Sequence, residues 1–224
     1  MDTETSSREP ALPRPVSRRQ QAEATRGSLL RTAERLFAEH GLARVSNRRI
    51  VEAAGQANNS ALSYHIGTRT DLLRAITRAH AEPIAHRTRE LVELARGSTR
   101  PRDHVASLVL PYTEHLAELG NPSWYARFTA QVHTDPGATA GLHDDPLLTS
   151  FLQEGDAAVW AHVPDLPAAE AALRRQTARL AVIHTCAEQE RTAADTDTPA
   201  DWPLVGAALT DAVTGLLLAP RTPR

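Results

Sequence analysis

The sequence predicts an all-α protein: a small three-helix domain that contains a helix-turn-helix, followed by a bundle of about six helices. Apolar residues recur at the three- and four-residue spacing of helices along most of the chain. No stretch alternates apolar and polar residues as a half-buried strand would. Of the 224 residues, 41% are hydrophobic but only 4% are aromatic. We therefore expect about nine helices packed mainly through aliphatic residues and alanine.

The sequence of the amino-terminal part predicts an arm followed by three helices. Residues 1–21 are rich in proline, serine and arginine without helical periodicity, so we expect a basic arm with weak order. A first helix should begin near Ala22 and end at Gly41. A second should begin after the N-cap Ser46, and a third should span residues 59–65.

The rest of the chain predicts longer helices bounded by proline, glycine and aspartate. Thr68 and Asp71 form a capping-box pattern that opens a long helix. Further helix starts are expected at Asp103, Asn121-Pro122, Asp145-Pro146, Pro167 and just before Val205, with a loop over 135–145, a polar linker over 192–200, and kinks at Pro83 and Pro111. The expected parts are an arm over 1–21, a helix-turn-helix domain over 22–70 and a second domain over 71–220.

Charge is distributed unevenly between these parts. Residues 1–79 hold 13 arginines and 8 acidic residues, a net charge of +5, whereas the remainder carries −7 within a total of −2. A basic head on an acidic body is typical of a nucleic-acid-binding domain joined to a partner domain, because the head must approach phosphates. Chance scatter is the alternative.

Composition also excludes several classes of protein. The single cysteine, Cys186, cannot form an intrachain disulfide or a cysteine-rich zinc site, which fits a reducing compartment. No apolar stretch reaches the length of a membrane helix, and residues 1–20 lack the apolar segment of a signal peptide. We expect a cytoplasmic protein with no membrane contact, no metal and no cofactor.

An enzyme is the main alternative, because the chain has ten histidines and many carboxylates. Cys186 follows His184 by two residues on one expected helix, so their side chains should point apart. His115 and Glu118 could share a helix face as metal ligands, but a solvated helix flank explains them as well. No glycine-bounded turn surrounds a serine or cysteine nucleophile, so we expect no enzymatic activity.

Two short helices joined by a turn, on a basic segment, indicate a helix-turn-helix that places its second helix in the DNA major groove. Asparagine, serine and histidine can bond base edges there, while residues at helix starts contact phosphates. The candidate DNA-binding residues are Ser46, Asn47, Arg48, Asn58, Asn59, Ser60, Ser63, Tyr64, His65, Thr68 and Arg69. The alternative makes Asn58 and Asn59 turn residues and Tyr64 a core residue.

Several of these segments resemble the DNA-binding domain of the tetracycline-repressor (TetR) family over about residues 25–76. The resemblance rests on Leu36-Phe37, His40-Gly41, Ile50 to Gly55, Ser60 to Gly67 and Asp71 to Leu73. It implies a homodimeric, all-helical repressor whose variable carboxy-terminal domain binds a small effector and then releases DNA. The chain departs from the family pattern in a turn one residue longer before Ser60, in Ile66 for an aromatic residue and in Arg69 for lysine.

Aromatic residues concentrate in the expected carboxy-terminal domain. A ligand cavity in a helical bundle needs apolar walls and a few polar groups. The candidate ligand-binding residues, which would suit a hydrophobic or aromatic effector, are Tyr112, His115, Trp124, Arg127, Phe128, Gln131, Phe151 and Trp160. Ordinary core packing is the alternative for each aromatic residue.

The last two helices are candidates for a homodimer interface, because residues 205–217 present a regular stripe of leucine, valine and alanine. Two recognition helices held about 34–36 Å apart would address successive grooves of a palindromic operator in double-stranded DNA. Alternatively, the last helix lies in the monomer core. We expect a ligand-responsive repressor; the alternatives are a regulator with no small-molecule effector and a helical enzyme.

Overall fold

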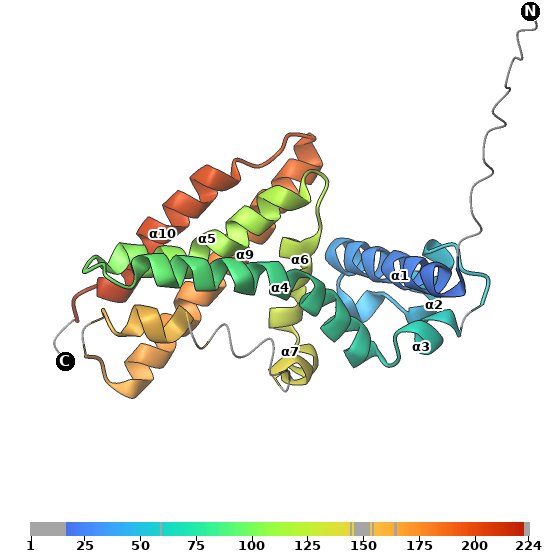
Figure 1. The fold of residues 1–224 in the computed structure, drawn as a ribbon, viewed down its shortest axis with the longest axis horizontal. Helices are drawn as coiled ribbons and strands as arrows, with labels where there is room; N and C mark the ends of the chain where they lie inside the picture. The colour runs from blue at the N-terminus through green and yellow to red at the C-terminus, as the bar shows by residue number, and fades with distance from the viewer. Residues whose placement is uncertain are drawn as a thin grey trace, which may run out of the picture.

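The chain consists of a small amino-terminal domain joined to a larger helical body by one long helix (Figure 1). The computed structural model describes residues 17–58, 60–143, 145, 153, 155–163 and 165–221. All regular secondary structure in these ranges is helical, with no strand, which confirms the all-α expectation. Within the same ranges, no helix has the length and apolar character needed to span a membrane.

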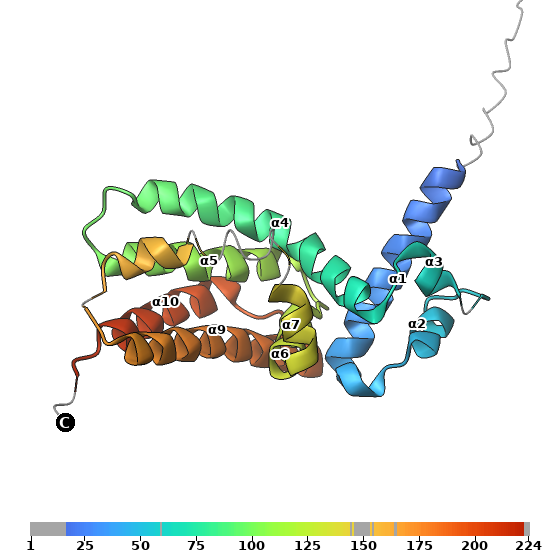
Figure 2. The same ribbon diagram turned by 90° about the horizontal axis from the view of Figure 1, so that it is seen from below.

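The amino-terminal domain is built from short helices around a single core. Its elements are α1 (Arg18–His40), a 3-10 turn (Leu42–Arg44), α2 (Asn47–Ala53), α3 (Ala61–His65) and the first turns of α4 (Arg69–Ala95). α2 and α3 pack against α1, and α4 then leaves the domain and runs along the whole body (Figure 2).

Aliphatic residues at helical spacing fill the core of this domain. Leu29 and Phe37 of α1, Ile50 of α2 and Leu72 of α4 are fully buried, and Leu62 of α3 is 1% exposed. Burying such a side chain stabilises the fold by about 1.5–3 kcal/mol. The core therefore fixes the angle between α2 and α3, which leaves the opposite face of α3 in solvent.

The body is a layered bundle. It contains α5 (Pro101–Leu119), α6 (Tyr125–Thr134), α7 (Pro136–His143), a helical segment over 155–160, α9 (Ala168–Thr196) and α10 (Trp202–Leu218). α5 packs against both α4 and α10, and α6 packs against α9. α6 and α7 lie at the end of the bundle that faces the amino-terminal domain (Figure 2).

α1 begins earlier than expected. The Ser17 hydroxyl accepts from the Gln20 amide at 3.2 Å, while the Gln20 side chain accepts from the Ser17 amide at 2.9 Å. This capping box satisfies two orphan donors and starts the helix at Arg18, so residues 18–21 are not part of an arm. The other residues of the expected arm, 1–16, lie outside the described part of the chain.

Two further expectations fail around α6 and α7. Asn121-Pro122 does not open α6, which begins at Tyr125. The segment 135–145, expected to be a loop, is mostly α7. Its start has a local cause, because the Asp135 carboxylate accepts from the Ala138 amide at 3.0 Å and thus caps the helix.

Helix boundaries also differ elsewhere in the body. α5 begins at Pro101, so Asp103 lies inside its first turn, where it accepts from the Ser98 hydroxyl at 2.6 Å. α9 extends through Thr196 and takes up the first half of the expected linker over 192–200. Of the helix expected after Asp145-Pro146, residues 146–152 lie outside the described chain.

Both internal prolines lie within continuous helices. α4 extends past Pro83, and α5 extends past Pro111, which is itself buried. A helix can keep proline in its interior when neighbouring packing compensates for the missing hydrogen bond. Neither residue therefore ends its helix.

Candidate functional site

The turn between α2 and α3 is held by its own side chains. Gly55 has φ +70°, a left-handed conformation that favours glycine. The Asn58 side-chain oxygen accepts from the Ser60 amide at 2.9 Å and from its hydroxyl at 2.7 Å. Asn58 thus has a turn role, as the alternative interpretation held. Asn59 lies outside the described residues.

α3 presents a large aromatic side chain to solvent. Tyr64 is 84% exposed, and Ser63 beside it is also exposed. The ring of Tyr64 makes an edge contact with His65, with ring centroids 4.9 Å apart. Arg26 of α1 donates to the His65 carbonyl at 2.8 Å and so fixes the end of α3. The exposed tyrosine therefore stands on a rigid support, which excludes a core role for it.

The start of α2 lies beside this surface. Ser46 caps α2 by accepting from the Arg49 amide at 3.2 Å. Asn47 and Arg48 are exposed, and the Arg48 guanidinium donates to Glu52 at 2.7 Å, which raises the pKa of Arg48. A solvent-exposed ion pair is worth little, so Arg48 can exchange Glu52 for a phosphate.

The start of α4 is capped by Thr68. Its hydroxyl accepts from the Asp71 amide at 3.2 Å and donates to the Asp71 carboxylate at 2.7 Å. These bonds lower the pKa of Asp71. With the Thr68 amide donating to the same carboxylate at 3.0 Å, these bonds form a capping box at the start of α4.

Arg69 differs from the expected phosphate contact. Its guanidinium donates to the Val45 carbonyl at 2.9 Å and to the Leu42 carbonyl, and it lies 4.8 Å from the centre of the Phe37 ring. Burial lowers the pKa of Arg69. The side chain joins α4 to the 3-10 turn inside the domain. A role of Arg69 in DNA binding therefore stays a prediction, and in this structure its guanidinium is occupied by contacts within the domain.

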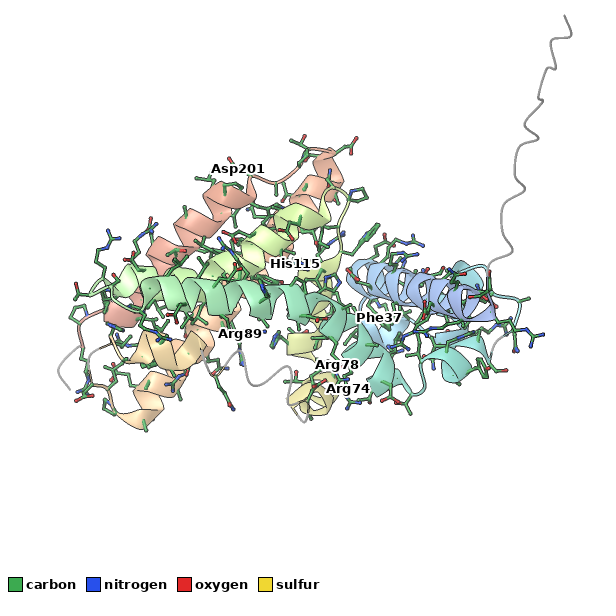
Figure 3. The ribbon with its side chains drawn as sticks, in the orientation of Figure 1. Phe37, Arg74, Arg78, Arg89, His115 and Asp201 are labelled. Atoms are coloured by element: carbon green, nitrogen blue, oxygen red, sulfur yellow. The ribbon has the colours of Figure 1, made fainter. Side chains whose placement is uncertain are left out.

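In the body, three candidate ligand-binding residues meet around one buried tyrosine. Tyr125 lies 6.0 Å from Tyr112, 5.8 Å from His115 and 6.3 Å from Phe128, measured between ring centroids. His80 of α4 stacks on Tyr125 at 3.8 Å. Figure 3 shows His115 within the body beside α4. His80 was not a candidate, since no spacing in the sequence links α4 to α6.

Polar atoms inside this cluster lack hydrogen-bond partners among the described residues. They are Nδ1 of His115 and the hydroxyls of Tyr112 and Thr129, of which Thr129 lies close enough to Tyr112 and Tyr125 to offset part of the rise in their pKa values. Burial raises the pKa of Tyr112 well above its usual value. Leaving such a group unpaired costs about 1–3 kcal/mol, so a ligand that bonds these atoms would recover that free energy.

Arg127 is engaged in the packing of α6 on α9. The Glu190 carboxylate, with its side chain 1% exposed, accepts from Nε of Arg127 at 3.2 Å and from its amide at 2.9 Å. Glu190 also accepts from the Ser123 hydroxyl at 2.8 Å and from the Ala126 amide at 3.2 Å. Glu190 therefore caps α6 from another helix, a role that no local sequence pattern indicates.

The remaining candidates do not join the cluster. Oε1 of Gln131 lies 3.3 Å from where a Cβ on Gly41 would be, at the boundary with α1. Trp160 donates to Asp156 at 2.8 Å and lies under the Arg175 guanidinium. Trp124 is the half-buried N-cap residue of α6, and Phe151 lies outside the described residues.

A separate cavity of about 220 Å³ lies where the end of α5 and the segment that follows it meet α9 and the start of α10. It is lined by Ala117, Gly120, Asn121, Ser123, Glu190, Ala193, Pro199, Ala200, Trp202 and Pro203. None of the candidate ligand-binding residues lines it. Across the described ranges, no three histidine, cysteine, aspartate or glutamate side chains gather as a metal site.

Acidification should weaken the fold through His115. Burial and the neighbouring His80 lower the pKa of His115 from 6.5 to about 4. Because the folded pKa is depressed, the contribution of His115 to stability is complete above its unfolded pKa and is lost as the pH falls toward 4. Between about pH 7 and about pH 4.5, we expect the wild type to lose about 2 kcal/mol more unfolding free energy than His115→Gln in urea titrations. Equal losses in the two proteins would contradict this expectation.

Comparisons with known proteins agree with this geometry. Residues 29–76 match the family model described as "Bacterial regulatory proteins, tetR family". No curated protein matches the chain at a significant level.

Solved structures resemble nearly the whole chain. The fatty acid degradation regulator FadR from Bacillus halodurans is 18% identical with a TM-score of 0.55, and the match covers 89% of this chain and 97% of that one. A TetR family transcription regulator from Marinobacter aquaeolei VT8 is 17% identical with a TM-score of 0.53, and the match covers 87% and 97%. These likenesses show the fold. Residues 29–76 therefore match the tetR family of bacterial regulatory proteins, and the described residues share the fold of these solved regulators.

Proposed function

We propose that the protein is a transcriptional repressor, rather than an enzyme, that binds a palindromic operator as a homodimer and is released by a small effector. The observation that carries this proposal is Tyr64, 84% exposed on a short helix whose other face is anchored in the core. A rigidly held, exposed aromatic side chain, in a domain that also exposes Arg48, suits a partner that offers both phosphates and stacked bases.

Tyr64→Ala should weaken binding to an operator duplex by about 1–3 kcal/mol, because the contact to DNA is lost. The duplex is selected by the wild type from a random-sequence pool, and binding is measured by fluorescence anisotropy. Since Tyr64 is so exposed, the melting temperature should not change. Leu94→Ala is the control, because Leu94 is 77% exposed on the body. Unchanged operator affinity in Tyr64→Ala would remove α3 from the interface.

Arg48→Ala separates the two kinds of DNA contact. As a phosphate ligand, Arg48 should contribute equally to the free energy of binding to operator and random duplexes. Its removal should therefore weaken both complexes and make the affinity less dependent on salt. In this proposal Arg48 contacts phosphate, whereas Ser63 and Asn59 contact base edges. Selection of a duplex without two-fold symmetry would count against a dimeric operator complex.

The effector part of the proposal rests on the cluster around Tyr125. Three buried polar atoms there lack partners among the described residues, on Tyr112, His115 and Thr129. A molecule with an apolar body and a hydrogen-bonding group would match this surface. A screen of small molecules for loss of operator binding tests it, and a screen without any releasing compound favours a regulator with no effector.

The outer faces of α9 and α10 support a homodimer. Leu173 of α9 is 62% exposed and Leu204 of α10 is 63% exposed. Along α10 the small residues Ala208, Ala212 and Gly215 are exposed as well. Small residues allow helices of two subunits to approach closely, and exposed leucines lose water when they do.

Ala208→Arg should dissociate this dimer, raising the dimer dissociation constant at least about tenfold, because a charge would be buried at the interface. Sedimentation velocity measures the change. Leu94→Arg, on the far end of α4, introduces the same charge at another exposed apolar position and should leave the dimer intact. A wild type that sediments as a monomer, or a dimer unaffected by Ala208→Arg, would rule out this interface.

A further inference from the structure

A chain of polar side chains crosses the boundary between the amino-terminal domain and the body. Oε2 of Glu34, on α1, lies 3.1 Å from Nε2 of His80, on α4. Nδ1 of His80 lies 2.8 Å from Nε2 of His115, on α5. The side chains of Glu34 and His80 are each 12% exposed. Three helices from two domains are thus joined by two largely buried hydrogen bonds.

The rings have little freedom to leave this chain. His80 stacks on Tyr125 with an interplanar angle of 16°, and His115 meets the same ring edge-on at 84°. Apolar contact continues beside the chain, because Phe37 of α1 stacks on Phe128 of α6 at 6.2 Å. Substituting His80 therefore removes the polar link while leaving the aromatic contact between the domains.

Each hydrogen bond in the chain restricts the positions of the protons. Ionised Glu34 accepts, so Nε2 of His80 carries a proton. When His80 is neutral, its Nδ1 is an acceptor, Nε2–H of His115 donates to it, and Nδ1 of His115 is a bare acceptor. When His80 is protonated, its Nδ1–H donates to Nε2 of His115, and the proton of neutral His115 then lies on Nδ1.

Three neighbouring titratable groups carry no charge near pH 7 and so do not compete for the proton. Burial raises the pKa values of Tyr112 and Tyr125, and it raises that of Cys186, on α9, to about 12. All three therefore stay neutral near pH 7.

The other titratable groups around His80 are carboxylates and the imidazole of His115. Glu190 of α9 is paired with Arg127, so Glu34 is the carboxylate that faces His80 directly. The pKa of His115 is lowered to about 4 by its burial and by His80. Of the two imidazoles, His115 therefore stays neutral near pH 7.

We propose that the Glu34–His80–His115 chain couples the body to the DNA-binding domain, with His80 as the positioning residue whose protonation state shifts operator affinity. Protonated His80 forms an ion pair with ionised Glu34 of α1, a stronger contact than the hydrogen bond from neutral His80, because the two groups then carry opposite charges. The same event turns Nδ1 of His115 from an acceptor into a donor. This regulation rests on the proposed repressor function.

The coupling also selects a class of effector. Nδ1 of His115 is buried and lacks a partner among the described residues. A ligand with a carbonyl or carboxylate at that atom favours the form in which His80 is protonated and bonded to Glu34 through its charge. A ligand that donates there favours neutral His80. By thermodynamic linkage, either ligand shifts the equilibrium between protonated and neutral His80. The size of the shift is set by the difference in the ligand's affinity for the two forms.

Operator affinity as a function of pH tests the proposal with the proton itself as the probe. Full-length protein and its selected duplex are titrated from about pH 5.5 to about pH 8 at constant ionic strength. We expect the ratio of wild-type to His80→Gln affinity to change by about threefold or more over this range. His86→Gln, an exposed histidine of the same helix, should keep the wild-type profile.

The direction of the change identifies which orientation binds DNA. If acidification raises the operator affinity of the wild type relative to His80→Gln, the form with protonated His80 binds the operator. If acidification lowers that affinity, the form with protonated His80 is the one that releases it. Either result supports the coupling. Parallel profiles of wild type and His80→Gln would overturn it. Glu34→Gln keeps an acceptor without its charge and should give an intermediate profile.

Nitrogen-15 spectra of the histidine rings in the unbound protein keep this proposal separate from the repressor function. We expect His115 to remain neutral to about pH 5 while its proton changes from Nε2 to Nδ1 as His80 titrates. Independent titration of the two rings would overturn the chain even if the operator is bound normally. If no duplex is bound at any pH, the proposed repressor function fails, and joint titration still supports the proton link.

Discussion

Glu190→Ala should destabilise the body by about 3–5 kcal/mol, because it removes the acceptor from a buried ion pair. The carboxylate accepts from the Ser123 hydroxyl, from two amides at the start of α6 and from the Arg127 side chain. Alanine would leave these donors buried without a partner, and the Arg127 guanidinium without its counter-charge. Urea unfolding monitored by circular dichroism measures the loss.

Two companion variants give this result a scale. Glu188→Ala removes an exposed carboxylate of the same helix, which pairs with Arg191, and should cost less than about 0.5 kcal/mol. Glu190→Gln keeps an acceptor but not the charge, so its cost should fall between the two. If Glu190→Ala were as stable as Glu188→Ala, the capping of α6 by α9 would not contribute to stability.

Phe128→Ala should cost about 3–5 kcal/mol, because it opens a cavity where the body meets the amino-terminal domain. The side chain is 1% exposed and stacks on both Phe37 and Tyr125. Figure 3 shows Phe37 at the end of α1 that faces the body. The loss should appear as a lower melting temperature, together with faster amide hydrogen exchange along α6 and the end of α1.

Tyr64→Ala is the matched control for removal of an aromatic ring, since Tyr64 is 84% exposed. It should leave both the melting temperature and hydrogen exchange unchanged. A Phe128→Ala protein that exchanges faster in α6 alone, with α1 unaffected, would show that this ring does not link the two domains.

The predicted helices were most accurate where apolar spacing and caps lie close together in the chain. Leu29, Phe37 and Ile50 were expected on inward helix faces and are fully buried. Thr68 and Asp71 form the expected capping box. Such features depend on residues three or four positions apart, so the sequence displays them directly.

Boundaries were less accurate where two start signals compete. Asn121-Pro122 has the pattern of a helix start, yet α6 begins at Tyr125, where Glu190 from another helix caps it. The Asp135-Pro136 start of α7 was hidden within a segment rich in glycine and aspartate. In the first case the decisive hydrogen bonds come from more than sixty residues away.

Candidate site residues divide in the same way. Tyr64 was expected at the DNA-facing surface, and its exposure on α3 is compatible with that expectation. Arg69 was also expected to contact DNA, because it lies at a helix start. Its guanidinium instead lies over Phe37 inside the domain. A long flexible side chain can point to either side of a helix end, and the sequence does not record which side offers carbonyl acceptors.

By itself, the sequence determined an all-helical chain with a basic helix-turn-helix head, because helix periodicity and local charge are properties of neighbouring residues. The tertiary structure decided which polar groups meet: Glu190 with the start of α6, and Glu34 with His80 and His115. These partners lie on different helices, far apart in the chain. Their pairing depends on how the apolar faces pack, since that packing sets the distances between buried polar atoms.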